Sequence, residues 1–362
     1  MRLQENARRM CNRNAAVSGT LFVATVLLVT ASGHAQETLY YADIFYPTFS
    51  HGYLRKVNTD GTGLQTLVNT GDGLRGVAVD RAAGKIYWTD VNADAIWRCN
   101  LNGTGVEDLV TAGLEFPMAI DLNPLNRKLY WGDQGLNLIG CANLDGSNPA
   151  VLLDTSFSSG LAVDAVHGKI YWSTSITGTQ GEIRRANLDG SGIETVVTGA
   201  GKPATIAVDV AGGKVYWTDY VLDVVRRANL DGTGVEDLFV VGANLNPGGI
   251  ALDLPGGKVY WGQDVSLPPY VGKIMRMNLD GSDPEDVAVN LGMVTDLVLP
   301  APVLGDLDND NNVDLTDFLL FADCMTGPNI PPAPGCKPAD LEHDNDVDLA
   351  DFRVLQAAFT GS

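Results

Sequence analysis

Two acidic stretches near the end of the chain carry side-chain oxygens at a fixed spacing. The first, "DLDNDNNVDLTD", begins at residue 306, and the second, "DLEHDNDVDLAD", begins at residue 340. Calcium prefers oxygen ligands, and a 12-residue loop supplies them from positions 1, 3, 5, 7, 9 and 12, with position 7 contributing its backbone carbonyl. The residues at these positions are Asp306, Asp308, Asp310, Asn312, Asp314 and Asp317 in the first stretch, and Asp340, Glu342, Asp344, Asp346, Asp348 and Asp351 in the second. We therefore predict that residues 306–362 bind two calcium ions.

A short amphipathic helix is predicted after each acidic stretch. Apolar residues recur at i, i+3 and i+7, as Phe318, Phe321 and Met325 in the first and as Phe352, Leu355 and Phe359 in the second. Residues 306–362 hold 12 acidic and two basic side chains, and the clustered carboxylates repel one another unless a cation neutralises them. We expect this small α domain to fold only with metal. The alternative is a disordered acidic tail.

The larger part of the chain repeats one pattern six times. A Tyr-Trp-Thr-Asp-like motif begins at Tyr40, Tyr87, Tyr130, Tyr171, Tyr216 and Tyr260, at intervals of 41 to 47 residues. Asn-x-Asp/Asn-Gly turns begin at Asn58, Asn100, Asn143, Asn187, Asn229 and Asn278. Short apolar strands are read as ending at Asp80, Asp121, Asp164, Asp209, Asp253 and Asp296. Four strands per repeat match one blade of a β-propeller, so residues 36–300 are predicted to form a mainly β, six-bladed ring.

The order of the markers also predicts how the ring closes. The first copy of the repeat begins directly at its second strand, "TLYYAD", whereas residues 292–299 form a first strand without a blade of its own. We expect this C-terminal strand to complete the N-terminal blade. The aspartates that end the apolar strands should accept hydrogen bonds from the N–H groups of their own turns. A cation held by a ring of these carboxylates is the alternative.

These repeats resemble the YWTD propeller of the low-density lipoprotein receptor family, whose class B repeats are shared with nidogen and the Wnt co-receptors. The resemblance covers about residues 37–300 and rests on motif, period and turn together. Cysteine-rich receptor modules do not flank the repeats here, so lipoprotein uptake is not implied.

The two loop–helix units resemble a dockerin type I domain, because neither loop is preceded by an entering helix. In that family, loop positions 10 and 11 contribute to contact with a cohesin scaffold. The matching residues are Leu315 and Thr316 in the first loop and Leu349 and Ala350 in the second. The resemblance also associates the chain with polysaccharide catabolism. Residues 301–305 are expected to be a linker between the two domains.

Three loops after the second strands are longer than the others, and two of them are rich in aromatic residues. The patch that they would form, if the ring closes as expected, contains Phe45, Tyr46, Phe49, Tyr53 and Tyr270. Such a patch suits a protein or glycan partner. The alternative is that these side chains fold back over the blade edge.

The four cysteines after residue 35 divide into two pairs. Cys324 and Cys336 bracket the connection between the acidic loops, and we expect them to form a disulfide. Cys99 and Cys141 are predicted on the third strands of adjacent blades, one residue out of register. The sequence leaves open whether these two pair or stay as buried thiols.

The N-terminus has the pattern of a secretory signal peptide. Arginines precede an apolar run from Gly19 to Ala35, and this run is shorter than the roughly 20 residues of a membrane span. Cleavage of residues 1–35 would remove four arginines and one glutamate, so the net charge would change from −20 to −23. A surface of this charge disfavours nucleic acid and anionic membranes as partners. The mature protein is expected to be secreted, with a periplasmic or cell-surface place as alternatives.

Taken together, these patterns predict an exported, non-catalytic binding protein that docks through a calcium-dependent module. No catalytic residue is predicted, because the histidines of the repeats lie in turns and loops without a paired nucleophile. One alternative is a propeller hydrolase acting on carbohydrate or lactone and delivered to a scaffold by the same module. A structural surface component is the other.

Overall fold

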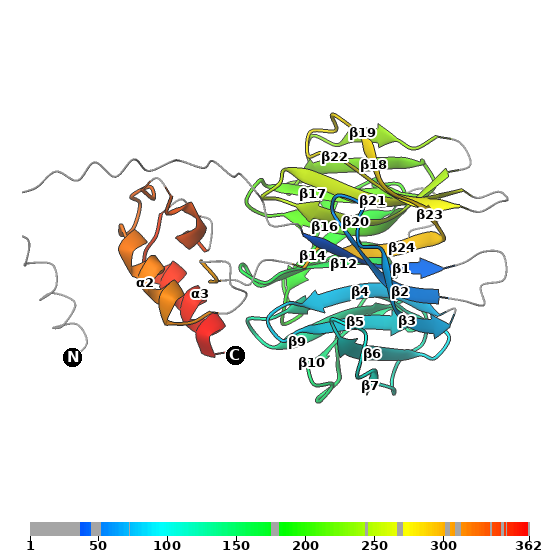
Figure 1. Cartoon of the computed structure of the whole chain (residues 1–362), viewed down its shortest axis with the longest axis horizontal. Coiled ribbons are helices and arrows are strands. Elements are labelled where there is room, and N and C mark those ends of the chain that lie inside the picture. The colour runs from blue at the N-terminus through cyan, green and yellow to red at the C-terminus, as the bar shows by residue number, and fades with distance from the viewer. Residues whose placement is uncertain are drawn as a thin grey trace, which may run out of the picture. The chain divides into compact units, whose positions relative to one another are not determined.

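A computed structural model of the chain describes residues 37–44, 52–71, 73–174, 181–242, 245–265, 271–300, 305–307, 313–333, 335–341, 344 and 346–360. The predicted signal peptide therefore lies outside the described residues. The described strands form six four-stranded sheets, which confirms the predicted six-bladed propeller (Figure 1). We number the sheets as blades 1 to 6 in ring order and call the contact between consecutive blades a seam.

The strands of each blade are given from the innermost to the outermost. Blade 1 contains β24 (Met293–Val298), β1 (Thr38–Ile44), β2 (Gly52–Asn58) and β3 (Gln65–Gly71). Blade 2 contains β4 (Leu74–Asp80), β5 (Lys85–Asp90), β6 (Ala95–Asn100) and β7 (Glu107–Val110). Blade 3 contains β8 (Pro117–Asn123), β9 (Lys128–Asp133), β10 (Leu138–Asn143) and β11 (Ala150–Asp154).

The other half of the ring has the same arrangement. Blade 4 contains β12 (Phe157–Asp164), β13 (Lys169–Thr174), β14 (Glu182–Asn187) and β15 (Glu194–Val197). Blade 5 contains β16 (Pro203–Asp209), β17 (Lys214–Asp219), β18 (Val224–Asn229) and β19 (Glu236–Val240). Blade 6 contains β20 (Leu245–Asp253), β21 (Lys258–Val265), β22 (Gly272–Asn278) and β23 (Glu285–Leu291).

Blade 1 is built from both ends of the propeller sequence, as predicted. Strand β24 pairs antiparallel with β1, so that Val298 lies opposite Tyr40 and Leu297 opposite Tyr41 (Figure 1). This pairing satisfies the backbone groups of β1 on its inner side and leaves no open edge between the first and last repeats. The predicted closure is confirmed.

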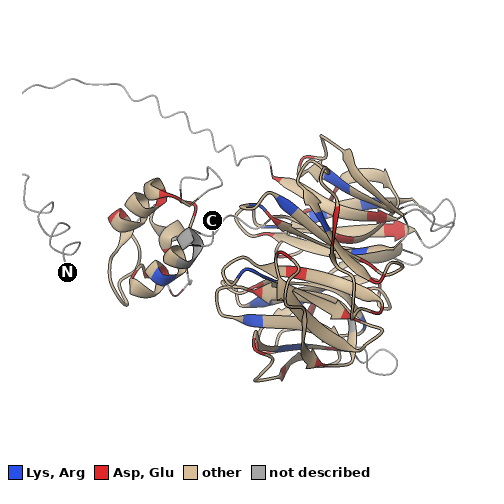
Figure 2. Ribbon diagram, turned by 90° about the horizontal axis from the view of Figure 1, so that it is seen from below, with Lys and Arg blue, Asp and Glu red and all other residues tan. Residues whose placement is uncertain are grey.

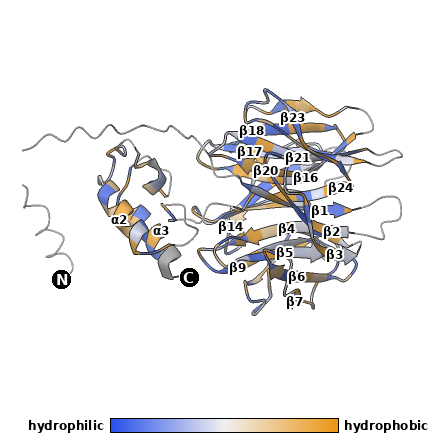
Figure 3. Ribbon diagram, viewed as in Figure 1, coloured by the Kyte–Doolittle hydropathy of each residue, from blue (hydrophilic) through white to orange (hydrophobic). Residues whose placement is uncertain are grey.

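The repeated Tyr-Trp pairs form the cores of the seams. Trp88, Trp172, Trp217 and Trp261 are among the largest fully buried side chains, and they pack with the apolar residues of neighbouring blades. Hydrophobic and hydrophilic residues both occur on the strands of the propeller (Figure 3). Because large aromatic side chains bury the most area per residue, the motif explains why each sheet requires a neighbour on both faces.

The Asn-x-Asp/Asn-Gly turns connect the third strands to the fourth and contact the preceding blade. In the turn at Asn143, the amide of Asn143 donates to Ser147 Oγ at 2.8 Å, and Ser147 Oγ donates to Asp145 Oδ1 at 2.6 Å. The glycine that follows, Gly146, lies directly against the carbonyl oxygen of Leu109 in the outer strand of blade 2. Each turn therefore links two blades at the rim.

The C-terminal residues, described by themselves, contain two helices. These are α2 (Leu315–Cys324) and α3 (Leu349–Thr360), with a 3-10 turn η1 (Lys337–Ala339) between them. A small core joins Phe321 of α2 and Leu355 of α3 to Leu341 and Val347 of the second acidic loop. The helix prediction was wrong for Met325, which follows the last helical residue with ψ of 115° and is exposed.

Candidate functional site

The second acidic loop brings several carboxylates into one place. One oxygen each from Asp340, Asp344 and Asp351 lies within 4.8 Å of the others, and the same holds for Asp346, Asp348 and Asp351. Asp351 belongs to both groups and is fully buried, while Asp340 and Asp346 are also buried. Buried carboxylates at this separation require a neutralising partner, because burial without one costs several kcal/mol per charge.

The geometry of this loop fits a calcium ion. Two oxygens bound to one Ca²⁺ at 2.3–2.6 Å are at most about 5 Å apart, and the spacing in the loop satisfies this limit. Asp346 Oδ1 is buried and has no hydrogen-bond partner, whereas Oδ2 accepts from the Asn329 N–H. A buried carboxylate oxygen without a partner is stabilised by a nearby cation, so it supports a cation site in this loop. Glu342 of this loop lies outside the described residues.

The first loop has the same local structure where it is described. Asp317, at its position 12, is fully buried and accepts from the N–H groups of Leu307 at 2.6 Å and Asp314 at 2.8 Å. In the second loop, Asp351 accepts equivalently from Leu341 at 2.6 Å and from Asp348 at 2.9 Å. Asp306 and Asp314 are described, whereas Asp308, Asp310 and Asn312 are not.

The entry into each helix is fixed by position 9 of its loop. Asp314 accepts from the Thr316 N–H at 2.7 Å and Asp348 from the Ala350 N–H, also at 2.7 Å. Both are N-caps, which satisfy amides that the helix itself leaves unpaired. A disulfide joins Cys324 at the end of α2 to Cys336 just before η1, with Cα atoms 5.3 Å apart.

The predicted docking residues lie at the first turns of the two helices. Leu315 and Leu349 are 64% and 66% exposed, Thr316 is exposed and Ala350 is partly buried. Near them the rings of Phe318 and Phe352 meet edge-on at 6.2 Å. The ribbon of α2 is largely hydrophobic (Figure 3). These side chains give the segment an exposed apolar surface beside its acidic loops.

Of the predicted aromatic patch on the propeller, only Tyr53 falls within the described residues. Its ring lies below the Arg55 guanidinium at 4.9 Å. Arg55 also pairs with the buried carboxylate of Asp43 at 2.6 Å, and burial raises the pKa of Asp43 to about 6 despite this partner. Phe45, Tyr46, Phe49 and Tyr270 lie outside the described residues.

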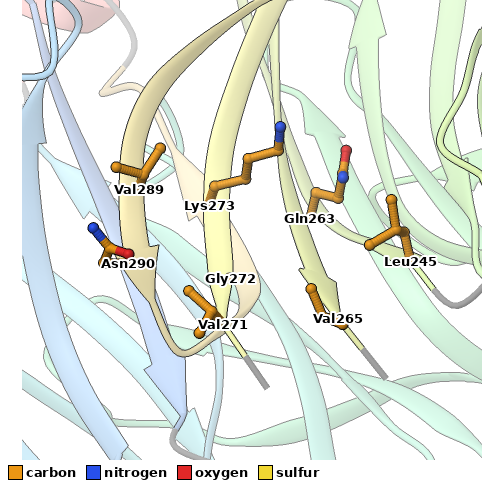
Figure 4. Close-up of a pocket in the computed structure, with 8 residues that line it drawn as sticks. All are labelled: Leu245, Gln263, Val265, Val271, Gly272, Lys273, Val289 and Asn290. Carbon is orange, nitrogen blue, oxygen red and sulfur yellow. The ribbon is translucent and has the colours of Figure 1, made fainter. Parts of the chain in front are cut away.

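A cavity of about 340 Å³ lies on one face of blade 6 (Figure 4). Its lining residues come from all four strands and the loop end of the blade, namely Leu245, Gln263, Val265, Val271, Gly272, Lys273, Val289 and Asn290. Gln263 stands where the repeat has Asp, and its Oε1 is buried without a hydrogen-bond partner. Lys273 pairs with Asp286 at 2.7 Å. The cavity is apolar with one unused amide oxygen.

The prediction for the strand-ending aspartates was right for four of them and wrong for two. Asp80, Asp164, Asp209 and Asp253 each accept from a backbone N–H of their own turn. In blade 3, Asn123 takes this place and Asp121 lies two residues earlier, within β8. Asp296 lies inside β24, opposite Ala42. The sequence held a signal for Asp121: it precedes the next strand's lysine by seven residues, whereas Asp80 precedes its lysine by five.

The two remaining cysteines are separate thiols. Cys99 packs in the core between blades 1 and 2, whereas Cys141 packs between blades 3 and 4. The pairing that the sequence had left open is therefore excluded in this structure. Burial raises the pKa of Cys99 to about 11 and also raises that of Cys141, so both thiols are poor nucleophiles at neutral pH.

No protein-family model matches the chain. Part of the propeller is similar to receptor-related proteins: 128 residues are 31% identical to human low-density lipoprotein receptor-related protein 5-like protein, covering 34% of this chain and 51% of that protein. Another 126-residue match, 39% identical, is to low-density lipoprotein receptor-related protein 5 of Mus musculus and covers 33% of this chain and 8% of that protein. The chain thus spans about half or less of these relatives.

Solved structures share the fold. A chain from the crystal structure of a nidogen/laminin complex superposes with a TM-score of 0.60 at 20% identity, covering 73% of this chain and 98% of that one. TolB from Acinetobacter baumannii superposes with a TM-score of 0.57 at 16% identity, covering 73% of this chain and 67% of that one. Fold and motif together define a six-bladed propeller of the YWTD type. No helix of the described residues is long and apolar enough to cross a membrane.

Proposed function

We propose that this chain is an exported, non-catalytic binding protein. Its propeller recognises a protein or glycan partner, and its acidic C-terminal segment binds two calcium ions and docks the protein to a cohesin-like scaffold. The observation that carries the proposal is the clustering of carboxylates in the second loop, where Asp351 belongs to two groups of three aspartates. The helix that follows, α3, begins with the exposed side chain of Leu349. Secretion fits this reading, since weak calcium sites are filled outside the cell.

Similarity to receptor-related proteins supports the binding role of the propeller. The structure from a nidogen/laminin complex is a further case in which a related propeller fold occurs within a protein assembly. On this chain, the cavity of blade 6 and the exposed side chains of Tyr220, Val221 and Leu222 in blade 5 supply apolar surface for a partner. Exposed apolar groups of this kind favour association.

Calcium would be held by the loop carboxylates described above and by the backbone carbonyl of Asp346 at position 7, and its charge would stabilise the nearby Asp346 Oδ1. The ion would supply positive charge that offsets the repulsion among the carboxylates. Leu341 and Val347 of the second loop contribute to the small core with Phe321 and Leu355. Order in the loop and packing of the helices are therefore coupled, and calcium should increase the helicity of the segment.

The test is a calorimetric calcium titration of the chain from Gln36, followed by circular dichroism and by a pull-down with and without calcium. We expect two binding events, a gain in helicity, and calcium-dependent capture of a partner. Asp344→Asn should weaken one of the sites at least about tenfold, because the side chain at position 5 of the loop loses its charge.

Asp323→Asn is the matched control, since Asp323 is exposed on α2 and outside both loops. It removes the same charge and should leave both calcium affinities unchanged. Absence of heat and of any helicity change would reject the calcium-dependent module. Equal losses in the two variants would show only general electrostatic attraction of the cation to an acidic segment.

A further inference from the structure

Four of the six seams share one rim contact, an arginine on the third strand of a blade. Each arginine pairs with a glutamate on its own outer strand and donates from Nη1 to a turn carbonyl of the next blade. The four contacts are Arg98 to Leu144 at 2.8 Å, Arg185 to Leu230 at 3.4 Å, Arg227 to Leu279 at 2.6 Å and Arg276 to Thr59 at 2.8 Å. These arginine clamps hold the seams 2/3, 4/5, 5/6 and 6/1. Acidic and basic residues occur throughout the strands of the propeller (Figure 2).

The seams 1/2 and 3/4 lack the arginine. Strand pairing places Arg98 opposite Tyr87, and at the equivalent positions in blades 1 and 3 the residues are Lys56, opposite Tyr40, and Cys141, opposite Tyr130. The outer-strand glutamate is also replaced in blade 3, where Cys141 lies opposite Ala150. These two seams are joined by their apolar cores, and seam 1/2 also by the ion pair between Arg81 and Glu37.

The two displaced aspartates add one further contact at each of these seams. Asp296 Oδ2 accepts from the Val77 N–H of blade 2 at 2.9 Å, across the seam 1/2. Asp121 Oδ2 accepts from the Val163 N–H of blade 4 at 2.7 Å, across the seam 3/4. The other oxygen of each accepts from the next residue of its own strand, Leu297 and Leu122. Carboxylate bridges therefore occur at the same two seams from which the arginine clamps are missing.

Both bridges lie among the innermost strands, where most blades carry small residues. The residues equivalent to Asp296 are Gly76, Ala119, Gly160, Thr205 and Gly249, and those equivalent to Asp121 are Ala78, Ala162, Ala207, Ala251 and Val298. Burial among these strands raises the pKa of Asp296 to about 7 and that of Asp121 to about 6. The charge of Asp121 adds a smaller rise to the pKa of Asp296.

The charged groups on the strands packed against β24 and β8 are engaged elsewhere. Arg75 donates to its neighbour's carbonyl, Asp43 pairs with Arg55, Lys273 with Asp286, and Arg276 with Glu285. Lys85 and Lys258 donate hydrogen bonds to asparagine side chains of the turns. The positive charge of Lys128 lies near the Cys141 thiol and acts to lower its pKa. Asp264 accepts a hydrogen bond from the Asn246 side chain. Backbone N–H groups of turns donate hydrogen bonds to the carboxylates of Asp80, Asp90, Asp133, Asp164 and Asp253. The bridging carboxylates accept hydrogen bonds from backbone N–H groups.

We propose that the two carboxylate-bridged seams form a proton-controlled latch, which holds the ring most firmly in acid and opens first as the solution becomes neutral or alkaline. The ring then has two arcs, blades 2–3 and blades 4–5–6–1, that are each clamped by arginines. The latch lies between them. In an exported protein, this arrangement would allow the acidity of the surroundings to control how readily the two arcs separate.

The sign follows from linkage. A carboxyl group in an opened, solvated seam has a pKa near 3.9, below the values in the closed ring. The closed seam therefore binds the proton more tightly, so the closed state is favoured fully below about pH 4 and loses this advantage as pH rises through about 6 to 7. A difference of about three pKa units corresponds to a limit of ~1000-fold in the opening equilibrium.

Hydrogen exchange of the whole protein tests the latch. Protection factors, corrected for the intrinsic pH dependence of exchange, would be measured at about pH 5 and about pH 8. Peptides from β4 and β12, which contain the bridged amides of Val77 and Val163, should lose protection by at least about tenfold on going to the higher pH. Strands β16 and β20 adjoin only arginine-clamped seams and should show much smaller changes.

Two variants distinguish an effect of the carboxylate bridges from a general loss of stability of the propeller at higher pH. Asp296→Asn should remove the pH dependence from β4 and leave it in β12, while Asp121→Asn should do the reverse, so each variant is the other's control. Equal pH dependence in β4, β12, β16 and β20 of the unaltered protein would overturn the latch, and this comparison needs no variant to fold. So would a pH dependence of β4 that survives Asp296→Asn.

Discussion

Single residues at the rim decide how closely two blades can approach. Gly146 has φ of +82°, and a Cβ atom at this position would lie 2.3 Å from the carbonyl oxygen of Leu109. Gly168 also has a positive φ, of +63°, but a Cβ atom there would meet nothing within 4 Å. Substituting Gly168 therefore tests only the free-energy cost of a side chain in the left-handed conformation. Substituting Gly146 tests that cost together with the steric clash against blade 2.

We expect Gly168→Ala to lower the free energy of unfolding by about 1 kcal/mol, because the left-handed conformation alone is penalised. Gly146→Ala should lower it by at least about 2 kcal/mol, because the backbone of blade 2 must also move. Urea denaturation of both variants measures the difference. Equal losses would mean that the turn does not press on the preceding blade.

For single residues, the sequence showed where an aspartate recurs but not always which groups it contacts. Four aspartates occupy the turn position that the repeat implies, whereas Asp121 and Asp296 bridge blades instead. The reason is register, since a shift of one or two residues within a strand changes the neighbours of a side chain without altering the composition of the repeat. Cys99 and Cys141 illustrate the same limit, because adjacent blades present them to different seams.

At the scale of elements, the arginine clamp is a unit that can be transferred. In blade 3, Cys141 and Ala150 occupy the positions that Arg98 and Glu107 hold in blade 2. The double variant Cys141→Arg with Ala150→Glu should add the ion pair and a bond to the turn carbonyl of Leu188 in blade 4. We expect it to raise the free energy of unfolding by about 1 kcal/mol, since one net hydrogen bond and one exposed ion pair are gained.

Thermal or urea unfolding measures this gain, with Cys141→Arg alone as the control that lacks the carboxylate. The double variant should be the more stable of the two, and it should also reduce the hydrogen exchange of β12. A double variant no more stable than the single one would show that seam 3/4 does not have the geometry of the clamped seams.

Helix ends were predicted less well than helix starts. Asp314 caps α2 where the acidic loop ends, and the apolar spacing correctly placed Phe321 in the core. The same spacing included Met325, but the helix ends at Cys324. Pro328 follows four residues after Cys324; it has no N–H to donate to the Cys324 carbonyl and its ring would clash with that carbonyl in a continued helix. A periodic pattern does not register such a stop, so it extended one residue too far.

For the whole molecule, the number of blades and the closure by β24 could be predicted because three markers recur six times and the first copy lacks a first strand. The differences among the seams could not be predicted from the repeats. Each seam depends on the residues of two particular blades, and the repeat pattern treats all blades as identical. The calcium loops were predicted from oxygen spacing alone, because such a loop takes its ligands from fixed positions in the sequence. The repeated residues of the blades therefore determine the fold, whereas the residues that depart from the repeat determine the contacts particular to each seam.

Closure by β24 should make the ring one cooperative unit. Leu297 of β24 is buried in the core that blades 1 and 6 share, whereas Val289 of β23 is 50% exposed. Leu297→Ala should lower the free energy of unfolding by about 2–4 kcal/mol, as expected for a buried leucine, and Val289→Ala by less than about 1 kcal/mol. Tryptophan fluorescence and far-ultraviolet circular dichroism should report the same transition for both variants, because a closed ring has no free end from which blades can unfold one at a time. Separate transitions in Leu297→Ala, with one probe changing before the other, would show that the blades unfold independently and that β24 does not unite them.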